Sequence, residues 1–248
     1  PDKNRTSLQQ LVDYLDDKHM LLLLDNYEHL LDGASIVTDI LNATSQTKIL
    51  VTSRQRLHES NEHPVELKAM SYPAWETLED AMAYDASQLF VQSARRIQAD
   101  FELTSDNLGY ITRICQVVQG LPLGIVLAAS WLQMLSPAEI VTEMKKDFDF
   151  LESDFVDLPE RQRSMRQVFD YSWQLMTEKE QEILIALSVF RGGFARDAAT
   201  AVCQASLRDL MGLMNKSLIQ RDTESGRYSI HELLRQYAAE KLQQSTRE

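Results

Sequence analysis

The chain has 248 residues, of which 25 are Lys or Arg and 37 are Asp or Glu, so its formal net charge is −12. A hydrophobic fraction of 44% and a charged fraction of 25% are ordinary for a globular protein and argue against general disorder. The excess of acids argues against broad nonspecific binding of nucleic acid, because such binding needs a basic surface. The length allows two or three small domains.

The charge is unevenly distributed along the chain. Residues 1–155 contain 24 acids and 12 bases, whereas residues 156–248 contain 13 of each, so the whole excess falls in the first part. This asymmetry indicates separate domains, which we place at residues 1–73, 74–150 and 156–248. No apolar stretch approaches the roughly 18–20 residues of a membrane helix, and no signal peptide is present. We therefore expect a cytoplasmic protein without membrane contact.

The first domain is predicted to be α/β. An amphipathic helix at 6–18 precedes five apolar residues that end at Asp25, a pattern typical of a strand buried on both faces of a parallel sheet. A helix at 35–42 and a strand at 47–54 complete a βαβ unit, which implies a right-handed crossover. Residues 65–67 are expected to add a short third strand.

From Tyr72 onward the pattern is helical. Helices are expected at 80–99, 104–118 and 122–134, and after Ser136, where Ser136 and Glu139 form a capping box. Pro122 suits the first turn of its helix. We expect residues 147–159 to be a linker. The two cysteines, Cys115 and Cys203, lie in apolar helical surroundings and are expected to be buried and reduced.

The last part is predicted to be a winged-helix domain. Helices at 164–173, 177–188, 195–203 and 207–215 precede two short strands, at 217–221 and 227–230, which flank a polar turn. Thr177 and Glu180 form a capping box at the start of the second of these helices. A final helix is expected at 231–243. The predicted fold class is therefore α/β followed by all-α.

The first candidate site lies where the first strand ends. An acid there holds its carboxylate at the carboxyl edge of a parallel sheet, where ligands bind in open α/β folds. Asp25 can hold Mg²⁺ through water beside a nucleotide, or it can be a solvated acid at a strand end. Asn26 follows, where a hydrolytic enzyme more usually has a second acid. An amide cannot abstract a proton, but it can orient water.

Three further sets of residues are candidates. Thr52, Ser53 and Arg54 end the next strand at the same edge, and Arg54 is suited to pair with a terminal phosphate or with Asp25 or Glu28. The Gly-Pro break at 120–124 is either a functional site or a simple break between two helices. His231 and Glu232 begin the last helix, where a His can contact phosphate or the pair can simply start the helix. The remaining histidines lack metal-ligand spacing.

A phosphate-binding loop of the type G-x-x-x-x-G-K-[ST] is missing from the sequence. Such a loop needs a Gly followed by Lys, and none of the eight glycines is followed by Lys.

Taken together and in order, these motifs resemble the nucleotide-binding regulatory core of the signal-transduction ATPases with numerous domains, the STAND class, in an NB-ARC-type arrangement. The closest resemblance is to large bacterial ATP-dependent transcriptional regulators. Residues 21–30 are similar to that family's Walker B strand, and residues 48–54 to its sensor strand, whose Arg approaches the γ-phosphate. Residues 120–123 match its GLPL motif, whose Pro, here Pro122, packs near adenine.

The last part carries the resemblance further. Residues 161–166 and 189–194 resemble the start of the family's winged-helix domain. Ile230-His231-Glu232 stands where the family has its MHD-type motif, whose His touches the β-phosphate of ADP; Glu in place of Asp is a departure from that motif. The resemblance implies a switch in which ADP holds the winged helix against the nucleotide domain and ATP releases it for oligomerisation.

The resemblance also implies partners outside the sequence given. The family's Walker A loop is expected just before Pro1, so we interpret the chain as a fragment that contains the C-terminal part of a P-loop NTPase parallel sheet, a helical bundle and a winged helix. The alternative is a natural protein that has lost its P-loop. ATP or ADP and Mg²⁺ are expected to bind when that upstream segment is present. The expected partners are this segment, other domains of a longer chain and further copies of the protein. The chain alone is expected to hydrolyse little or no ATP.

Two other functions stay open. One is a DNA-binding winged-helix regulator, although residues 195–218 contain only three bases against two acids, which is meagre for phosphate contacts. The other is a protein-interaction scaffold that binds no nucleotide.

Overall fold

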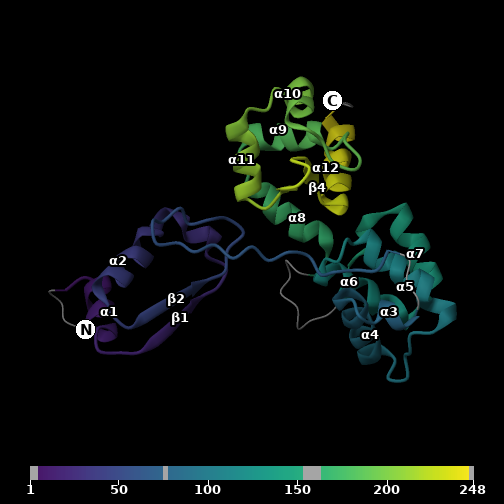
Figure 1. The fold of residues 1–248 in the computed structure, drawn as a ribbon, viewed down its shortest axis with the longest axis horizontal. Helices are drawn as coiled ribbons and strands as arrows, with labels where there is room; N and C mark the ends of the chain where they lie inside the picture. The colour runs from purple at the N-terminus through teal and green to yellow at the C-terminus, as the bar shows by residue number, and fades with distance from the viewer. Residues whose placement is uncertain (1–4, 75–77, 153–162, 246–248) are drawn as a thin grey trace. The chain divides into compact units, whose positions relative to one another are not determined.

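The computed structural model describes residues 5–74, 78–152 and 163–245 (Figure 1). The chain divides into two compact units, one of residues 1–66 with 211–217 and the other of residues 67–210 with 218–248. Within the described ranges, no helix is both long enough and apolar enough to cross a membrane.

The first unit contains the predicted βαβ arrangement. Its elements are helix α1 (Ser7–Leu15), strand β1 (Met20–Leu24), the 3-10 helix η1 (Tyr27–Gly33), helix α2 (Ser35–Ala43) and strand β2 (Thr47–Val51). The strands β1 and β2 are parallel, and their register runs from Met20 opposite Thr47 to Leu24 opposite Val51. Helix α2 runs beside the two strands (Figure 1). The parallel pairing confirms the prediction made from the spacing of the apolar runs.

One face of this sheet is covered and the other is bare. Residues Leu24, Ile49 and Val51 pack against a cluster that contains Tyr27 and Val37. On the opposite face, the side chains that alternate with these are exposed, at 64% for Leu21, 63% for Leu23 and 54% for Leu50. The prediction that β1 is buried on both faces is therefore wrong for this structure, because η1 and α2 cover one face alone.

The predicted strand at 65–67 is also wrong. These residues have no regular secondary structure, and Val65 and Leu67 are 83% and 90% exposed. Alternating apolar residues favour an extended backbone, but a strand forms only when its N–H and C=O groups pair with a neighbour. The local pattern carries no information about that neighbour.

The second unit begins with a helical segment, residues 78–152. It contains α3 (Leu78–Ala81), α4 (Asp85–Ile97), α5 (Ser105–Val117), α6 (Pro122–Ser130), η2 (Trp131–Gln133), α7 (Pro137–Lys146) and η3 (Phe148–Phe150). Its core is built from fully buried side chains, which include those of Phe90, Ile114, Cys115, Ile125, Leu127 and Ile140. Capping boxes begin α5 at Thr104 and α7 at Ser136.

Two helices of this segment differ from their predicted lengths. The predicted helix at 80–99 is broken by a turn before Tyr84, whose extended backbone begins α4, with Asp85 in the favourable first turn. The helix that starts at Pro122 ends at Ser130 and continues as η2. Both cysteines are free, but only Cys115 is fully buried, and burial raises the pKa of its thiol to about 12.

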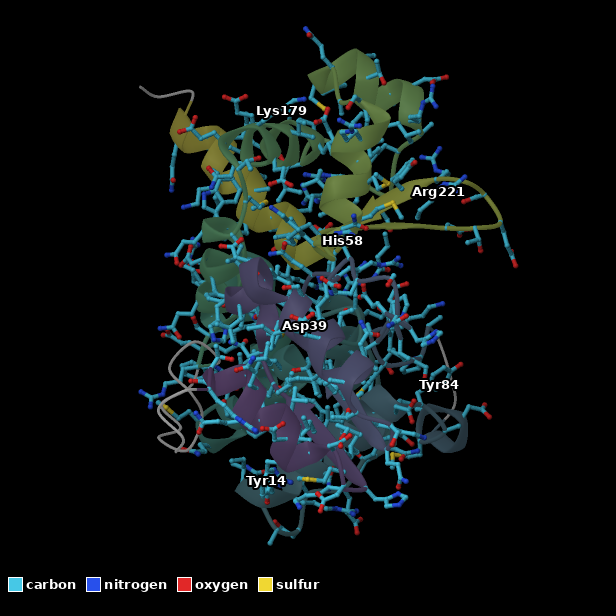
Figure 2. All side chains as sticks on the ribbon, turned by 90° about the vertical axis from the view of Figure 1, so that its left-hand side faces the viewer. Tyr14, Asp39, His58, Tyr84, Lys179 and Arg221 are labelled. Atoms are coloured by element: carbon cyan, nitrogen blue, oxygen red, sulfur yellow. The ribbon has the colours of Figure 1, made fainter. Side chains whose placement is uncertain are left out.

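The C-terminal segment, residues 163–245, has the predicted order of elements. It contains α8 (Met165–Gln174), α9 (Glu178–Leu187), α10 (Arg196–Cys203), α11 (Leu207–Asn215), β3 (Ile219–Arg221), β4 (Tyr228–Ile230) and α12 (Glu232–Ser245). The strands form an antiparallel hairpin on which Arg221 is labelled in Figure 2. The predicted capping box at Thr177 is present. The boundary between the two units falls within α11.

Aromatic side chains hold this segment together. Tyr237 of α12 packs against Phe169 and Trp173 of α8, at ring-centroid distances of 5.8 and 5.7 Å. Phe194 stacks on Tyr228, and the backbones of these two residues exchange a pair of 2.8 Å hydrogen bonds. The hairpin is thereby attached to the loop that precedes α10.

Candidate functional site

Thr52 joins the carboxyl ends of the two parallel strands. Its hydroxyl donates a hydrogen bond to Asp25 and accepts one from the Asn26 N–H at 2.9 Å. Its backbone N–H donates to the Leu24 carbonyl, and its carbonyl accepts from the Tyr27 N–H, each at 2.9 Å. The exposed carboxylate of Asp25 is therefore held at the sheet edge by the residue that follows the neighbouring strand, and the sequence correctly predicts that these two residues share this edge.

Asn26 makes the sharp turn between β1 and η1. Its φ is 60°, in the left-handed region that Asn tolerates better than most residues. Its side-chain nitrogen lies 3.5 Å from Nδ1 of His29. The residue after Asp25 thus has a backbone role, and its amide lies at the same edge as the carboxylate.

Arg54 lies beside Glu28. Its Nε is 3.8 Å from Oε1 of Glu28, whose side chain is 2% exposed, whereas the Arg54 side chain is 33% exposed. Glu28 Oε1 has no hydrogen-bond partner among the described residues. A buried carboxylate is costly without a nearby cation, so this pair restrains the guanidinium. Sequence reasoning named Glu28 only as a surface partner for Arg54 and did not foresee its burial.

The sheet edge offers Mg²⁺ one carboxylate, that of Asp25. Asp25 supplies a single exposed carboxylate, and no group of three or more His, Cys, Asp or Glu among the described residues could hold a metal by itself. Mg²⁺ commonly binds through one or two carboxylates, waters and substrate phosphates. The single carboxylate at this edge is therefore compatible with an ion that brings its own phosphate and water ligands.

His231 contacts the helical segment with one ring nitrogen. Its Nε2 lies 3.0 Å from the Val118 carbonyl, and its Nδ1 accepts a 3.3 Å bond from the Leu233 N–H. Because Nδ1 accepts, the ring hydrogen is assigned to Nε2, which donates to Val118. Burial lowers the pKa of His231 to about 4, so the ring is neutral at pH 7.

Glu232 completes the start of α12. Its N–H donates to Oε1 of Gln119 at 2.8 Å, and its carboxylate accepts two 2.8 Å bonds from Arg235. These hydrogen bonds lower the pKa of Glu232. Arg235 also donates to the Ser188 carbonyl at 2.9 Å, which fixes the start of α12 to the end of α9. Glutamate in this position therefore binds an arginine one turn further along the helix.

The Gly-Pro break at 120–122 is tightly packed. Gly120 has a φ of 71°, and a Cβ added there would lie 2.0 Å from the Met70 carbonyl oxygen. The Met70 N–H donates to the Gly120 carbonyl at 3.0 Å, and the Leu121 N–H donates to Val118 at 2.9 Å. Pro122 is exposed at the first position of α6. The glycine is thus required by a close backbone approach.

The predicted residues fall into two groups. Asp25, Asn26, Thr52 and Arg54 lie at one sheet edge in the first unit. In the second unit, the Val118 carbonyl links His231 to the loop before Pro122. Sequence reasoning missed Gln119, and its position directly before Gly120 is the signal that could have drawn attention to it.

Nearly the whole chain is similar in sequence to known proteins. No model of a known protein family matches. A protein of Mycobacterium tuberculosis, named provisionally as an HTH-type transcriptional regulator, is 33% identical over 253 residues, which cover 98% of this chain and 28% of that protein. A second M. tuberculosis protein, named as uncharacterized, is 31% identical over 252 residues, which cover 97% of this chain and 61% of that protein.

Nearly the whole chain is similar to one part of these longer proteins. Among solved structures, a STAND protein with a tetratricopeptide repeat sensor from Pyrococcus horikoshii matches 94% of this chain and 30% of its own, with a TM-score of 0.31 and 16% identity. The chain spans 28% and 61% of the two curated relatives described above.

Proposed function

We propose that the chain is part of a nucleotide-dependent switch in a STAND-type regulator, of the NB-ARC arrangement. The observation that carries this proposal is the sheet edge, where Asp25, Thr52 and Arg54 meet at the carboxyl ends of two parallel strands. Ligands bind at that edge in open α/β sheets. The similarity to a longer protein named as a transcriptional regulator supports the regulatory part of the proposal.

Each residue at this edge has a role in the proposal. Asp25 holds Mg²⁺ through water, and the bound ion offsets the negative charge of the phosphates. Arg54, restrained by Glu28, directs its guanidinium toward the terminal phosphate. Asn26 orients water without accepting its proton, so hydrolysis is slow. Thr52 keeps the Asp25 carboxylate at the edge.

The resemblance assigns nucleotide contacts to two residues of the second unit. Pro122 packs near the base. When a nucleotide is bound, the Nε2–H of His231 leaves the Val118 carbonyl and donates its hydrogen bond to a phosphate oxygen instead. His231 is suited to this exchange because its neutral ring presents a single donor. The winged-helix reading of the C-terminal segment belongs to the same proposal: while ADP is bound, His231 holds that segment in place, and ATP releases the segment so that copies of the protein associate.

The bare sheet face supports a larger nucleotide-binding domain. Parallel sheets are normally buried on both faces, and a two-stranded sheet is marginal by itself. Leu21, Leu23 and Leu50 nevertheless point to solvent. We expect a segment with a Walker A loop, encoded upstream, to cover this face and to supply basic groups that offset the excess of acids in the first part.

The test is the nucleotide content of a longer protein. The reading frame upstream of Pro1 is expected to encode a Gly-Lys-Thr or Gly-Lys-Ser loop within about 50 residues, by the usual length of a βαβ unit. That protein is purified and its bound nucleotide is identified; we expect ADP or ATP. Asp25→Ala should weaken Mg²⁺-dependent binding by about tenfold or more. Asp32→Ala, which removes a nearby exposed acid, should leave it unchanged.

Other outcomes would contradict the proposal. A longer protein without nucleotide, or an upstream frame without the loop, would favour a scaffold. Robust ATP turnover by the present chain, abolished by Asp25→Ala, would contradict the need for an upstream loop.

A DNA-binding function is the second candidate, favoured by the name of the mycobacterial relative. The charges near α10 and α11 weigh against it, because Asp209 is paired with Lys179 at 2.7 Å and the remaining bases are few. A salt-dependent shift of duplex DNA by the present chain would support DNA binding, and the absence of such a shift would leave the nucleotide switch as the proposal.

A further inference from the structure

The start of helix α12 takes one of its caps from a distant part of the chain. The first N–H groups of a helix have no partners within the helix and need acceptors from elsewhere. In α12, the Leu233 N–H is accepted by the neighbouring His231 ring, whereas the Glu232 N–H is accepted by the side chain of Gln119, 113 residues earlier. The helix therefore begins on a residue of the helical segment.

Gln119 has an unfavourable backbone for its residue type. Its φ is 46°, in the left-handed region just beyond the end of α5, where Gly or Asn is the usual residue. The backbone alone would favour glycine here. The side chain compensates by supplying the acceptor for Glu232, which a glycine lacks.

The residues on both sides of Gln119 keep this turn rigid. Val118 is fully buried, and its carbonyl accepts both the Leu121 N–H at 2.9 Å and the His231 Nε2–H at 3.0 Å. Gly120 is held against the Met70 backbone. Two acceptors, the Val118 carbonyl and the Gln119 amide oxygen, are thereby presented side by side to consecutive residues of the C-terminal segment, His231 and Glu232.

We propose that Gln119 is a positioning residue that caps helix α12 from the helical segment and thereby fixes the orientation of His231. The cap rests on the contacts above. Its consequence for nucleotide binding rests on the proposed function, in which His231 moves from Val118 to a phosphate. In that exchange the Gln119–Glu232 bond stays closed, so His231 turns about a fixed helix start and the helix does not detach.

The test uses the full chain and a matched pair of glycine variants. Gln119→Gly removes the side chain and suits the left-handed backbone, so the fold is retained. Gln204→Gly is the control, because Gln204 is an exposed glutamine at φ 55°, also just beyond a helix end. Gln119→Glu keeps an acceptor of the same reach and is the conservative rescue.

Amide hydrogen exchange and His231 ring signals are measured without nucleotide. Gln119→Gly should speed exchange at Glu232 by about tenfold and change the nitrogen shifts of the His231 ring, as expected for loss of one hydrogen bond. Gln204→Gly should change neither, and Gln119→Glu should restore slow exchange. Unchanged exchange at Glu232 in Gln119→Gly, or equal acceleration in Gln204→Gly, would overturn the proposal. Because no nucleotide is used, failure of the proposed function leaves this result unaffected.

Discussion

The sheet edge of the first unit and the start of helix α12 in the second unit differ in how many of their polar groups already have hydrogen-bond partners. We call the second place, where His231 and Glu232 contact Val118 and Gln119, the His231 joint. At the edge, Asp25 and Thr52 are exposed, and one face of the sheet is bare. At the joint, both ring nitrogens of His231 and the Glu232 N–H already have partners within the chain. The edge is open to a ligand, whereas a ligand at the joint must displace an existing hydrogen bond. A ligand at the His231 joint would therefore gain less binding free energy per hydrogen bond than a ligand at the sheet edge.

The largest expected effect is at Gly120. Gly120→Ala should lower the free energy of unfolding by about 3 kcal/mol, because the new methyl group meets the Met70 carbonyl in a left-handed backbone. Urea unfolding of the chain measures this. Gly109→Ala, in the middle of α5 with nothing within 4 Å of the added Cβ, is the control and should stabilise the chain by about 0.5–1 kcal/mol. Equal effects would mean that the joint is loosely packed.

The next effect concerns the buried carboxylate at the sheet edge. Arg54→Met should cost about 2–3 kcal/mol, because it leaves Glu28 without its cation in a side-chain environment that is almost closed to water. The control is Arg56→Met, at an exposed position two residues away, with an expected change of less than about 0.5 kcal/mol. A negligible effect of Arg54→Met in urea unfolding would indicate that water reaches Glu28.

A third prediction concerns pH. The pKa of His231 is lowered to about 4 in the folded chain, below its ordinary value of about 6.5. As the pH falls, the imidazole is protonated in the unfolded chain at a higher pH than in the folded chain. The folded state therefore keeps its full stability above about pH 6.5 and loses stability as the pH falls toward 4. Between pH 7 and pH 5 the loss is about 2 kcal/mol.

Comparison of variants separates the effect of His231 protonation from the effects of the other titratable groups. His231→Gln should remove it, so the variant should lose less stability than the parent chain between pH 7 and pH 5. The exposed His29→Gln should retain it. Identical pH profiles of the parent chain and His231→Gln in urea unfolding would contradict a buried neutral ring.

The smallest effect is expected on the bare face of the sheet. Leu50→Thr should change the stability of the present chain by less than about 0.5 kcal/mol, because Leu50 is 54% exposed. Ile49→Thr, which acts on the covered face, should cost about 2 kcal/mol. In a longer protein that covers the bare face, the Leu50 effect should rise toward the Ile49 effect. A persistently small effect there would mean that the face stays exposed.

Sequence reasoning worked where the determining information was local. Apolar periodicity located β1 and β2, and the capping residues Ser136 and Thr177 marked helix starts correctly. The meeting of Asp25 with Thr52 followed from parallel strands that end at one edge. Each of these depends on residues close in sequence or on a general rule of topology.

The remaining features depend on distant residues. The bare face of β1 follows from which elements are available to cover it, and the leucines themselves give no sign of this. The burial of Glu28 and the capping contact of Gln119 depend on where Arg54 and Glu232 lie in space. Composition and spacing contain no such information, so these contacts could be found only in the structure.

The backbone pairing of Phe194 with Tyr228 has a mechanical consequence. Strand β4 ends at Ile230 and α12 begins at Glu232, so His231 is the single residue between them. Because Tyr228 is fastened to Phe194 by two 2.8 Å bonds, the hairpin cannot absorb a displacement of His231 by swinging freely. Any movement that starts at His231 is therefore transmitted through β4 to the loop before α10, and a spectroscopic label in that loop would report it.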